Sequence, residues 1–167
     1  MKTLLLIRHA KSAAFGTEPG DHNRPLKSAG QAQTDILAAQ LIHAGRVPDL
    51  ALVSTALRTQ QTWAGLATHF KPTNAQHLEQ LYLASAKVIE TEIWRAAQEP
   101  ETLAVIGHNP GIAMLAWQLL ETGSTHETQA EQTVRGNFKT AYAACFDMSG
   151  AKPRLLQVFD PRSSDKN

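Results

Sequence analysis

Short apolar runs alternate along this chain with longer segments in which apolar residues recur at helical spacing. Five of the short runs predict strands: residues 3–7, 50–53, 102–106, 141–146 and 155–159. Residues 3–7 and 102–106 are unbroken, which is typical of strands buried on both faces of a central sheet. The last two runs flank a segment that contains Gly150, and so they predict two strands with a turn between them.

Four segments predict helices: residues 28–44, 55–70, 85–98 and 112–120. Ser28 is placed to cap the first of these helices and Gly45 to end it. Ser85 can cap the third helix. Pro100 ends that helix, because the residue before a proline disfavours helical backbone.

Strands that alternate with helices predict an α/β fold, a three-layer sandwich in which helices flank a mostly parallel central sheet. At 167 residues the chain has the usual size of one domain and can bury a substantial core. We therefore expect a single domain over residues 1–160, followed by a polar tail over residues 161–167.

The formal net charge of +1 argues against a protein that binds nucleic acid by general electrostatic attraction. A few converging arginines could still make one cleft positive and favour a phosphorylated ligand. The first apolar run stops at Arg8, far short of the ~20 residues of a membrane span, so we expect no membrane segment and a cytoplasmic protein. The single cysteine, Cys145, lies in an apolar run and is expected to be a buried structural thiol. A monomer is the default expectation.

Polar and cationic residues follow three of the predicted strands directly. Arg8 and His9 come after the first strand, Ser54 and Arg58 after the second, and His108 after the third. In open α/β sheets the ligand lies beyond the carboxyl ends of the strands. The sequence therefore predicts one site that collects these side chains.

Each of these residues alone has a simpler explanation. A histidine at a strand end is usually a hydrogen-bonded structural residue, and an arginine on the first turn of a helix is usually solvated. Their joint placement changes the interpretation, because a phosphoryl-transfer site needs several cations and hydrogen-bond donors that converge on one point.

Three short motifs resemble those of the histidine phosphatase superfamily, which includes relatives of phosphoglycerate mutase. They are Leu6-Ile7-Arg8-His9-Ala10, then Ser54 with Leu57-Arg58 and Thr62, and finally Gly107-His108-Asn109-Pro110. Arg24-Pro25-Leu26 and Gly30, in a chain this short, are similar to the SixA-type phosphohistidine phosphatase branch. The resemblance covers roughly residues 2–160 and implies a phosphoglycerate mutase-like fold.

The resemblance implies that His9 attacks phosphorus and becomes transiently phosphorylated, before water hydrolyses the intermediate. Arg8 and Arg58 match the phosphate-binding arginines, whose planar forks suit phosphoryl oxygens. His108 matches a second active-site histidine that donates a hydrogen bond to the phosphoryl group. His108 would do so best as an imidazolium, whereas His9 must be neutral, so we expect opposite protonation preferences.

The sequence lacks a clear proton donor for an alkoxide leaving group. Glu79 is the nearest carboxylate to the position where many superfamily members that cleave phosphate esters have an acid, but the alignment places Gln80 there. We interpret Glu79 as a solvated surface residue. An imidazole leaving group needs less help from a general acid than an alkoxide does. The missing acid therefore favours phosphohistidine on a protein over sugar phosphates as substrate.

Three further residues have less defined roles. Arg24 could contact the substrate or brace Asp21 and its loop, and bracing is favoured. Ser54 is expected to cap the following helix rather than to act in the site. Asn109 is expected to order the loop beside His108, and it is also a candidate for substrate binding.

Other functions stay open at this point. A broader phosphomonoesterase of the same superfamily, acting on small phosphate esters, is the main alternative. A mutase is disfavoured because the chain lacks long insertions to enclose an intermediate, and a non-enzymatic phosphate-binding module because His9 is present. The seven histidines show neither His-x-His nor His-Glu-x-x-His spacing, so we expect no metal and no cofactor.

Overall fold

The computed structural model describes residues 1–16, 20–71, 73–97, 100–123 and 128–162. Its strands are β1 (Thr3–Arg8), β2 (Leu50–Ser54), β3 (Asn74–Leu78), β4 (Thr102–Gly107), β5 (Ala143–Asp147) and β6 (Arg154–Phe159). Its α-helices are α1 (Ser28–His43), α2 (Leu57–Ala67), α3 (Ala86–Ala96), α4 (Gly111–Thr122) and α5 (Gln129–Arg135). Two 3₁₀ turns are η1 (Asp21–Asn23) and η2 (Glu79–Leu81).

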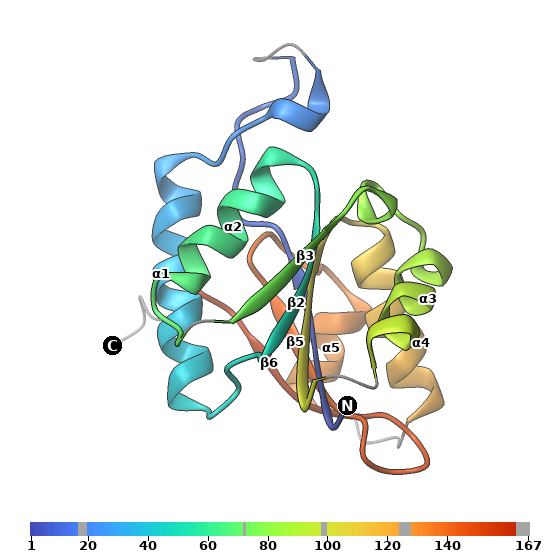
Figure 1. Cartoon of the computed structure of the whole chain (residues 1–167). Coiled ribbons are helices and arrows are strands. Elements are labelled where there is room, and N and C mark those ends of the chain that lie inside the picture. Colours follow the sequence, from blue (N-terminus) through green and yellow to red (C-terminus); the bar gives the residue numbers. More distant parts are fainter. Residues whose placement is uncertain (17–19, 72, 98–99, 124–127, 163–167) are drawn as a thin grey trace.

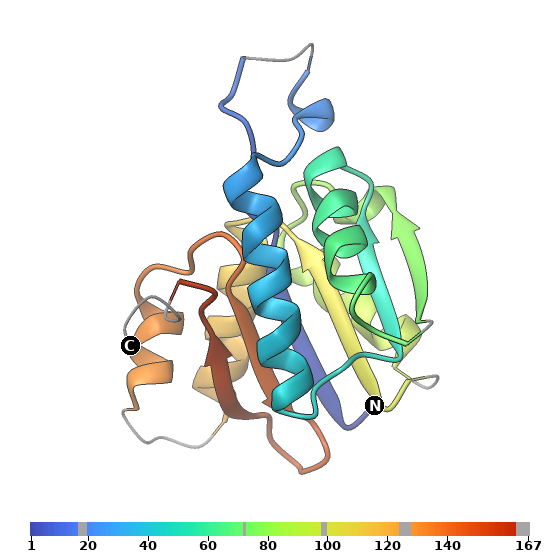
Figure 2. The ribbon, with the colours of Figure 1, turned by 90° about the vertical axis from the view of Figure 1, so that its left-hand side faces the viewer.

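The six strands form one sheet in the order β3-β2-β4-β1-β5-β6. The four strands from β3 to β1 are parallel, whereas β5 is antiparallel to β1 and β6 to β5. Helices cover both faces of this sheet, as Figures 1 and 2 show. The predicted three-layer sandwich with a mostly parallel sheet is confirmed.

Alternate residues of the central strands enter two different cores, as the twofold repeat of a strand requires. Leu5 and Ile7 pack with apolar residues of α1 and α2 on one face. Leu4 and Leu6 pack with residues of α3, α4 and α5 on the other face. The unbroken run in β1 is therefore buried on both sides, as predicted.

Several predicted boundaries differ by a few residues. The helix that starts near residue 55 begins only at Leu57, because Ala56 is extended. The strand expected from residue 141 begins at Ala143, because the backbone of Ala141 is left-handed with a φ of 61°. Ser28 is the first residue of α1 and not its cap, since Lys27 occupies the capping position. Ser85 does cap α3, and its hydroxyl accepts a hydrogen bond from the amide of Val88.

One strand and one α-helix were not predicted from the sequence. Strand β3 lies at the edge of the sheet, and none of its residues is fully buried. Helix α5 is short and mostly polar, and it is held at its start by a capping box between Thr128 and Glu131. Neither element carries the apolar signal that marks the other strands and helices.

Other expectations concern burial and the ends of the chain. Cys145 is fully buried in β5, and burial raises the pKa of its thiol to about 11, so the expected buried thiol is confirmed. Within the described residues, no helix is long and apolar enough to cross a bilayer. Most of the predicted polar tail, residues 163–167, lies outside the described residues.

Two glycines allow loops to approach helices closely beyond the carboxyl ends of the strands. A Cβ atom on Gly30 of α1 would collide with the backbone carbonyl of Lys11. A Cβ atom on Gly111 of α4 would collide with the backbone carbonyl of Ala84. The loop after β1 and the loop after η2 are thus each in direct backbone contact with the start of a helix.

Candidate active site

The strand order brings the predicted site residues to one place. Strand β4 lies between β1 and β2, so the residues that follow these three parallel strands meet at the same edge of the sheet. The amide of His9 donates to the carbonyl of Gly107 across β1 and β4, at 3.0 Å. The rings of His9 and His108 lie 5.3 Å apart, measured between centroids. In Figure 1 the connection from β1 to α1 rises beyond this edge.

A pocket of about 380 Å³ opens here. Nine residues line it: Arg8, His9, Phe15, Asp21, Arg24, Arg58, Leu83, His108 and Asn109. All of the residues that the sequence assigned to catalysis or substrate binding are among them. Phe15, Asp21 and Leu83 were not assigned to the site from the sequence.

His9 presents one unprotonated ring nitrogen. Its Nδ1 atom lies 2.8 Å from the carbonyl oxygen of Ala10, which can only accept, so Nδ1 carries the proton and Nε2 the lone pair. Burial lowers the pKa of His9 to about 4, against the raising effect of that hydrogen bond, and the charges of Arg58, Arg8 and Arg24 lower it further. His9 is therefore a neutral imidazole at pH 7.

His108 is also neutral, and its tautomer follows from its partners. Nη2 of Arg58, which can only donate, lies 3.2 Å from Nδ1, so Nε2 carries the proton and donates to the hydroxyl of Ser54 at 2.8 Å. Burial, followed by the charge of Arg58, lowers the pKa of His108 to about 3. Without a phosphoryl group His108 is thus neutral like His9, in contrast to the expected imidazolium, and its protonation beside a phosphoryl group stays a prediction.

Ser54 acts differently from the expectation. Helix α2 begins three residues after Ser54 and has no side-chain cap, and the Ser54 hydroxyl instead accepts the hydrogen bond from His108. Ser54 is the last residue of β2, so its side chain projects from the same sheet edge as His108. It is a positioning residue for His108 and not a helix cap.

Arg58 is the most buried cation of the site, with 1% of its surface exposed. Its Nη1 donates to the backbone carbonyl of Asp21 at 2.7 Å, and its Nη2 donates to the Asp21 carboxylate at 3.0 Å. Together with the contact to His108, these bonds hold the guanidinium in one orientation. A fixed, desolvated guanidinium is a strong binding group for phosphoryl oxygens.

Asp21 links the positive residues of the pocket. Its carboxylate accepts from Nε of Arg24 at 2.8 Å and from the hydroxyl of Tyr82 at 2.8 Å, in addition to Arg58. Partial burial acts to raise its pKa, but the hydrogen bonds from Tyr82 and Arg24 and the charge of Arg58 prevail and hold the pKa at about 2. Asp21 is therefore ionised and braces two arginines.

Arg24 has the bracing role that the sequence favoured. It braces Asp21, and its Nη1 donates to the hydroxyl of Ser12 at 2.8 Å and to the carbonyl of Ala13 at 2.6 Å. It also lines the pocket. The favoured bracing role is present in the structure, and a contact with the substrate stays a prediction.

Arg8 and Asn109 share one backbone acceptor. Nη1 of Arg8 and Nδ2 of Asn109 each donate to the carbonyl oxygen of Phe138 at 2.9 Å. Phe138 precedes β5, and its carbonyl links the loop after β4, which contains Asn109, to Arg8 at the end of β1. Asn109 thus orders the loop beside His108, as expected, and its part in substrate binding stays a prediction.

The candidate proton donor Glu79 lies elsewhere. Glu79 and Gln80 are both exposed in the turn η2, and neither lines the pocket. Asp21 is the one carboxylate among the pocket-lining residues, and it is ionised. The interpretation of Glu79 as a surface residue agrees with its position.

Metal-ligating side chains do not cluster in the described part of the chain. Over those residues, no group of three or more histidine, cysteine, aspartate or glutamate side chains is arranged to hold an ion. The pocket instead concentrates three arginines around one aspartate and two histidines. Such a site can hold an oxyanion and present a neutral histidine to it.

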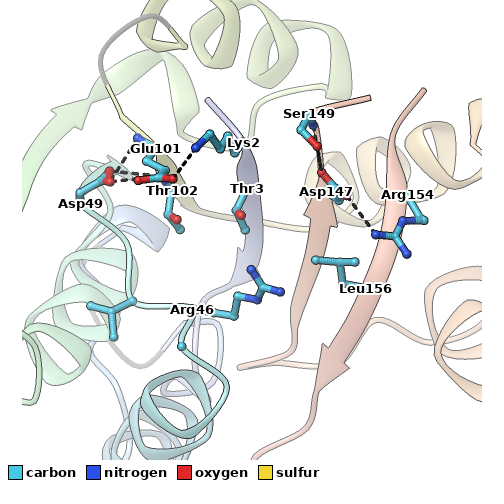
Figure 3. A pocket seen from close by; sticks show the side chains of 12 residues that line it. Lys2, Thr3, Arg46, Asp49, Glu101, Thr102, Asp147, Ser149, Arg154 and Leu156 are labelled. Carbon is cyan, nitrogen blue, oxygen red and sulfur yellow. Dashed lines mark hydrogen bonds and ion pairs between the residues drawn. The ribbon is translucent and has the colours of Figure 1, made fainter. Parts of the chain in front are cut away.

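A second pocket lies at the opposite end of the sheet, where the parallel strands begin (Figure 3). Its volume is about 480 Å³, and its charged side chains are mostly paired with one another, as in Lys2 with Glu101 and Arg154 with Asp147. It contains none of the residues that follow the three central strands. We therefore place the candidate site at the carboxyl ends of the strands.

The two buried histidines predict how stability depends on pH. Below about pH 6.5 they take up protons in the unfolded chain, whereas in the folded protein they do so only near pH 4 and pH 3. The free energy of unfolding should therefore fall as the pH is lowered from about 6.5 to about 4, by about 2 kcal/mol per pH unit for the two histidines together. Urea denaturation at pH 7, 6 and 5 measures this slope.

The control for this slope is the variant His9→Gln, which removes one of the two groups and should flatten the dependence. An unchanged slope in His9→Gln would show that His9 does not fold in its neutral form. The lowered pKa of Asp21 does not interfere, because protonation of Asp21 changes the free energy of unfolding only below about pH 4.

The comparisons with known proteins agree on one family. Residues 4–82 match the sequence model of the histidine phosphatase superfamily (branch 1). An uncharacterized protein from Mycobacterium tuberculosis is 32% identical over 144 residues, which cover 86% of this chain and 88% of that protein. The matched segment contains the whole of β1 after Thr3, together with α1, β2 and α2.

Two solved structures share nearly the whole fold. A candidate phosphohistidine phosphatase SixA from Agrobacterium tumefaciens superimposes with a TM-score of 0.81, at 25% identity, over 96% of this chain and 99% of that chain. A second candidate SixA, from Nakamurella multipartita, gives a TM-score of 0.84 at 25% identity over 96% of both chains. The similarity therefore extends well past residue 82, through β4 and the C-terminal strands.

Proposed function

Because the chain belongs to the histidine phosphatase superfamily and is a phosphatase of the SixA-like type, we propose that it hydrolyses phosphohistidine on a protein. The proposed reaction needs no metal ion and no cofactor. It proceeds through a phosphohistidine intermediate at His9. The similarity to candidate phosphohistidine phosphatases supports this substrate.

The observation that carries the proposal is the composition of the pocket. It combines a histidine with a free Nε2 lone pair and three arginines, and no protonated carboxylic acid is among the residues that line it. An alkoxide leaving group needs a proton donor, and the loss of general acid help slows such a reaction by roughly a hundredfold or more. An imidazole leaving group needs that help less.

The geometry supports a two-step reaction. In the first step Nε2 of His9 attacks phosphorus, the bond from phosphorus to the substrate imidazole breaks, and the departing nitrogen takes a proton from solvent. Positive charge then develops on the His9 ring. The hydrogen bond from Nδ1–H to the carbonyl of Ala10 stabilises this charge. In the second step water attacks phosphorus, the bond to Nε2 breaks, and a proton returns to solvent.

Arg58 and Arg8 are proposed to hold the phosphoryl oxygens during both steps. Arg58 is fixed by Asp21 and His108, and Arg8 by the carbonyl of Phe138. Charge on the equatorial oxygens is then matched by donors that do not have to reorganise. His108 is proposed to donate a hydrogen bond to the phosphoryl group as a neutral imidazole. Its Nε2–H, which donates to Ser54 in the structure, would then donate to the substrate instead.

The test is phosphate release in the presence of EDTA, measured with a phosphohistidine-bearing protein and with a simple alkyl phosphate. We expect kcat/KM to favour phosphohistidine by at least about a hundredfold and to be unchanged by EDTA. A preference for the alkyl phosphate would identify a broader phosphomonoesterase instead. Loss of activity with EDTA would contradict the metal-independent reaction.

The variant Glu79→Gln is the matched control for the missing acid. Glu79 is exposed and outside the pocket, so its replacement should change turnover of either substrate less than about twofold. If Glu79→Gln slowed only the alkyl phosphate a hundredfold, Glu79 would be the proton donor and the argument from the pocket would fail.

A further inference from the structure

Two large apolar side chains line the outer part of the pocket without being buried by the fold. Phe15, in the connection from β1 to α1, is 81% exposed, and Leu83, between η2 and α3, is 55% exposed. Both line the same pocket as His9 and Arg58, whose own exposure is 7% and 1%. We call Phe15 and Leu83 the apolar rim, because the other lining residues are charged or polar.

The backbone of Leu83 adds an independent observation. Its φ of 48° lies in the left-handed region, which a leucine side chain disfavours. Its neighbours hold it there: Leu81 and Ala84 are buried, and the amide of Ala84 donates to the carbonyl of Leu81. Neither backbone preference nor burial explains a leucine at this position. Strained residues and exposed apolar side chains both concentrate at binding sites.

We propose that the apolar rim selects protein substrates in which apolar side chains flank the phosphorylated residue. This inference rests on the proposed function. A pocket of about 380 Å³ has room for a phosphorylated side chain, and Phe15 and Leu83 both line it, so in this proposal the polypeptide that carries that side chain lies against the rim. Apolar flanking side chains would then cover Phe15 and Leu83 and remove apolar surface from water. A small phosphorylated molecule would leave the rim uncovered.

The experiment compares two phosphohistidine peptides of equal length and charge, one with leucine and one with serine on both sides of the phosphohistidine. Wild type should prefer the leucine peptide by roughly tenfold in kcat/KM. In the double variant Phe15→Ser, Leu83→Asn the ratio should fall to within about twofold. Asparagine is chosen because it tolerates left-handed backbone, so the side chain changes without added strain.

The matched control is Ile42→Ser, which removes an exposed apolar side chain from α1, outside the pocket. It should keep the tenfold preference. The ratio of the two kcat/KM values does not depend on the fraction of folded enzyme, so a destabilised variant still gives an answer. A ratio near one in wild type, or an unchanged ratio in the rim variant, would overturn the proposal.

Phosphoramidate separates failure of this inference from failure of the proposed function. Phosphoramidate has a phosphorus–nitrogen bond and no flanking residues. If wild type hydrolyses neither phosphoramidate nor either peptide, the proposed function falls and the rim proposal with it. If wild type hydrolyses phosphoramidate but treats the two peptides alike, only the rim proposal falls.

Discussion

Replacement of His9 by alanine is expected to reduce phosphate release from a phosphohistidine-bearing protein by at least about a thousandfold. The variant keeps Arg8, Arg58 and the rest of the pocket, so it should still bind the substrate. It lacks the nitrogen that accepts the phosphoryl group. The measurement is single-turnover phosphate release, together with a quench in alkaline detergent, in which phosphohistidine is stable, and detection of radioactive phosphate on the protein, which should be found in wild type only.

His43→Ala is the control for this variant. His43 is exposed at the end of α1 and lies outside the pocket, so this change should leave both turnover and trapped phosphate unaltered. Full activity of His9→Ala would refute a covalent intermediate at His9. Trapped phosphate on His9→Ala would place the intermediate on another residue.

Arg58→Lys is expected to lower kcat/KM by roughly a hundredfold to a thousandfold, although the charge is kept. One lysine nitrogen cannot reproduce the three contacts that Arg58 makes with the carbonyl and carboxylate of Asp21 and with His108. The measurement is kcat/KM with the phosphohistidine-bearing protein.

Arg95→Lys provides the comparison on the surface. Arg95 pairs with Glu92 on α3, and its side chain is 68% exposed, so the change should have little effect on kcat/KM. If Arg58→Lys kept kcat/KM within about threefold of wild type, a point charge would suffice at this position. The role given to the planar guanidinium would then be wrong.

The parts of the fold that the sequence predicts are those with a strong apolar signal. Strands β1, β2 and β4 are central and buried on both faces, so their residues form nearly continuous apolar runs. The edge strand β3, with the sequence Asn-Ala-Gln-His-Leu, is partly exposed and is bounded by no such run. Its pairing with β2 depends on tertiary contacts that no local pattern encodes.

The residues of the site also divide into those that the sequence predicts and those that it does not. Arg8, His9 and His108 come directly after central strands, and so the rule for open α/β sheets finds them. Asp21 reaches the site from the 3₁₀ turn η1, and its importance depends on contacts with Arg58 and Tyr82, which are 37 and 61 residues away in the chain. The protonation of His108 could not be predicted either, because it depends on burial and on the orientation of one guanidinium. Leu83 carries no sequence signal at all.

The backbone contacts at Gly30 and Gly111 bear on how much of the binding energy remains available for catalysis. They hold the backbone at Lys11 and at Ala84 against the starts of α1 and α4. Ordering a backbone costs about 1–2 kcal/mol per residue in conformational entropy, and at these two contacts that cost is met when the chain folds. The attraction between the arginines and a phosphoryl group can therefore act on the reacting atoms instead of organising the loops around them.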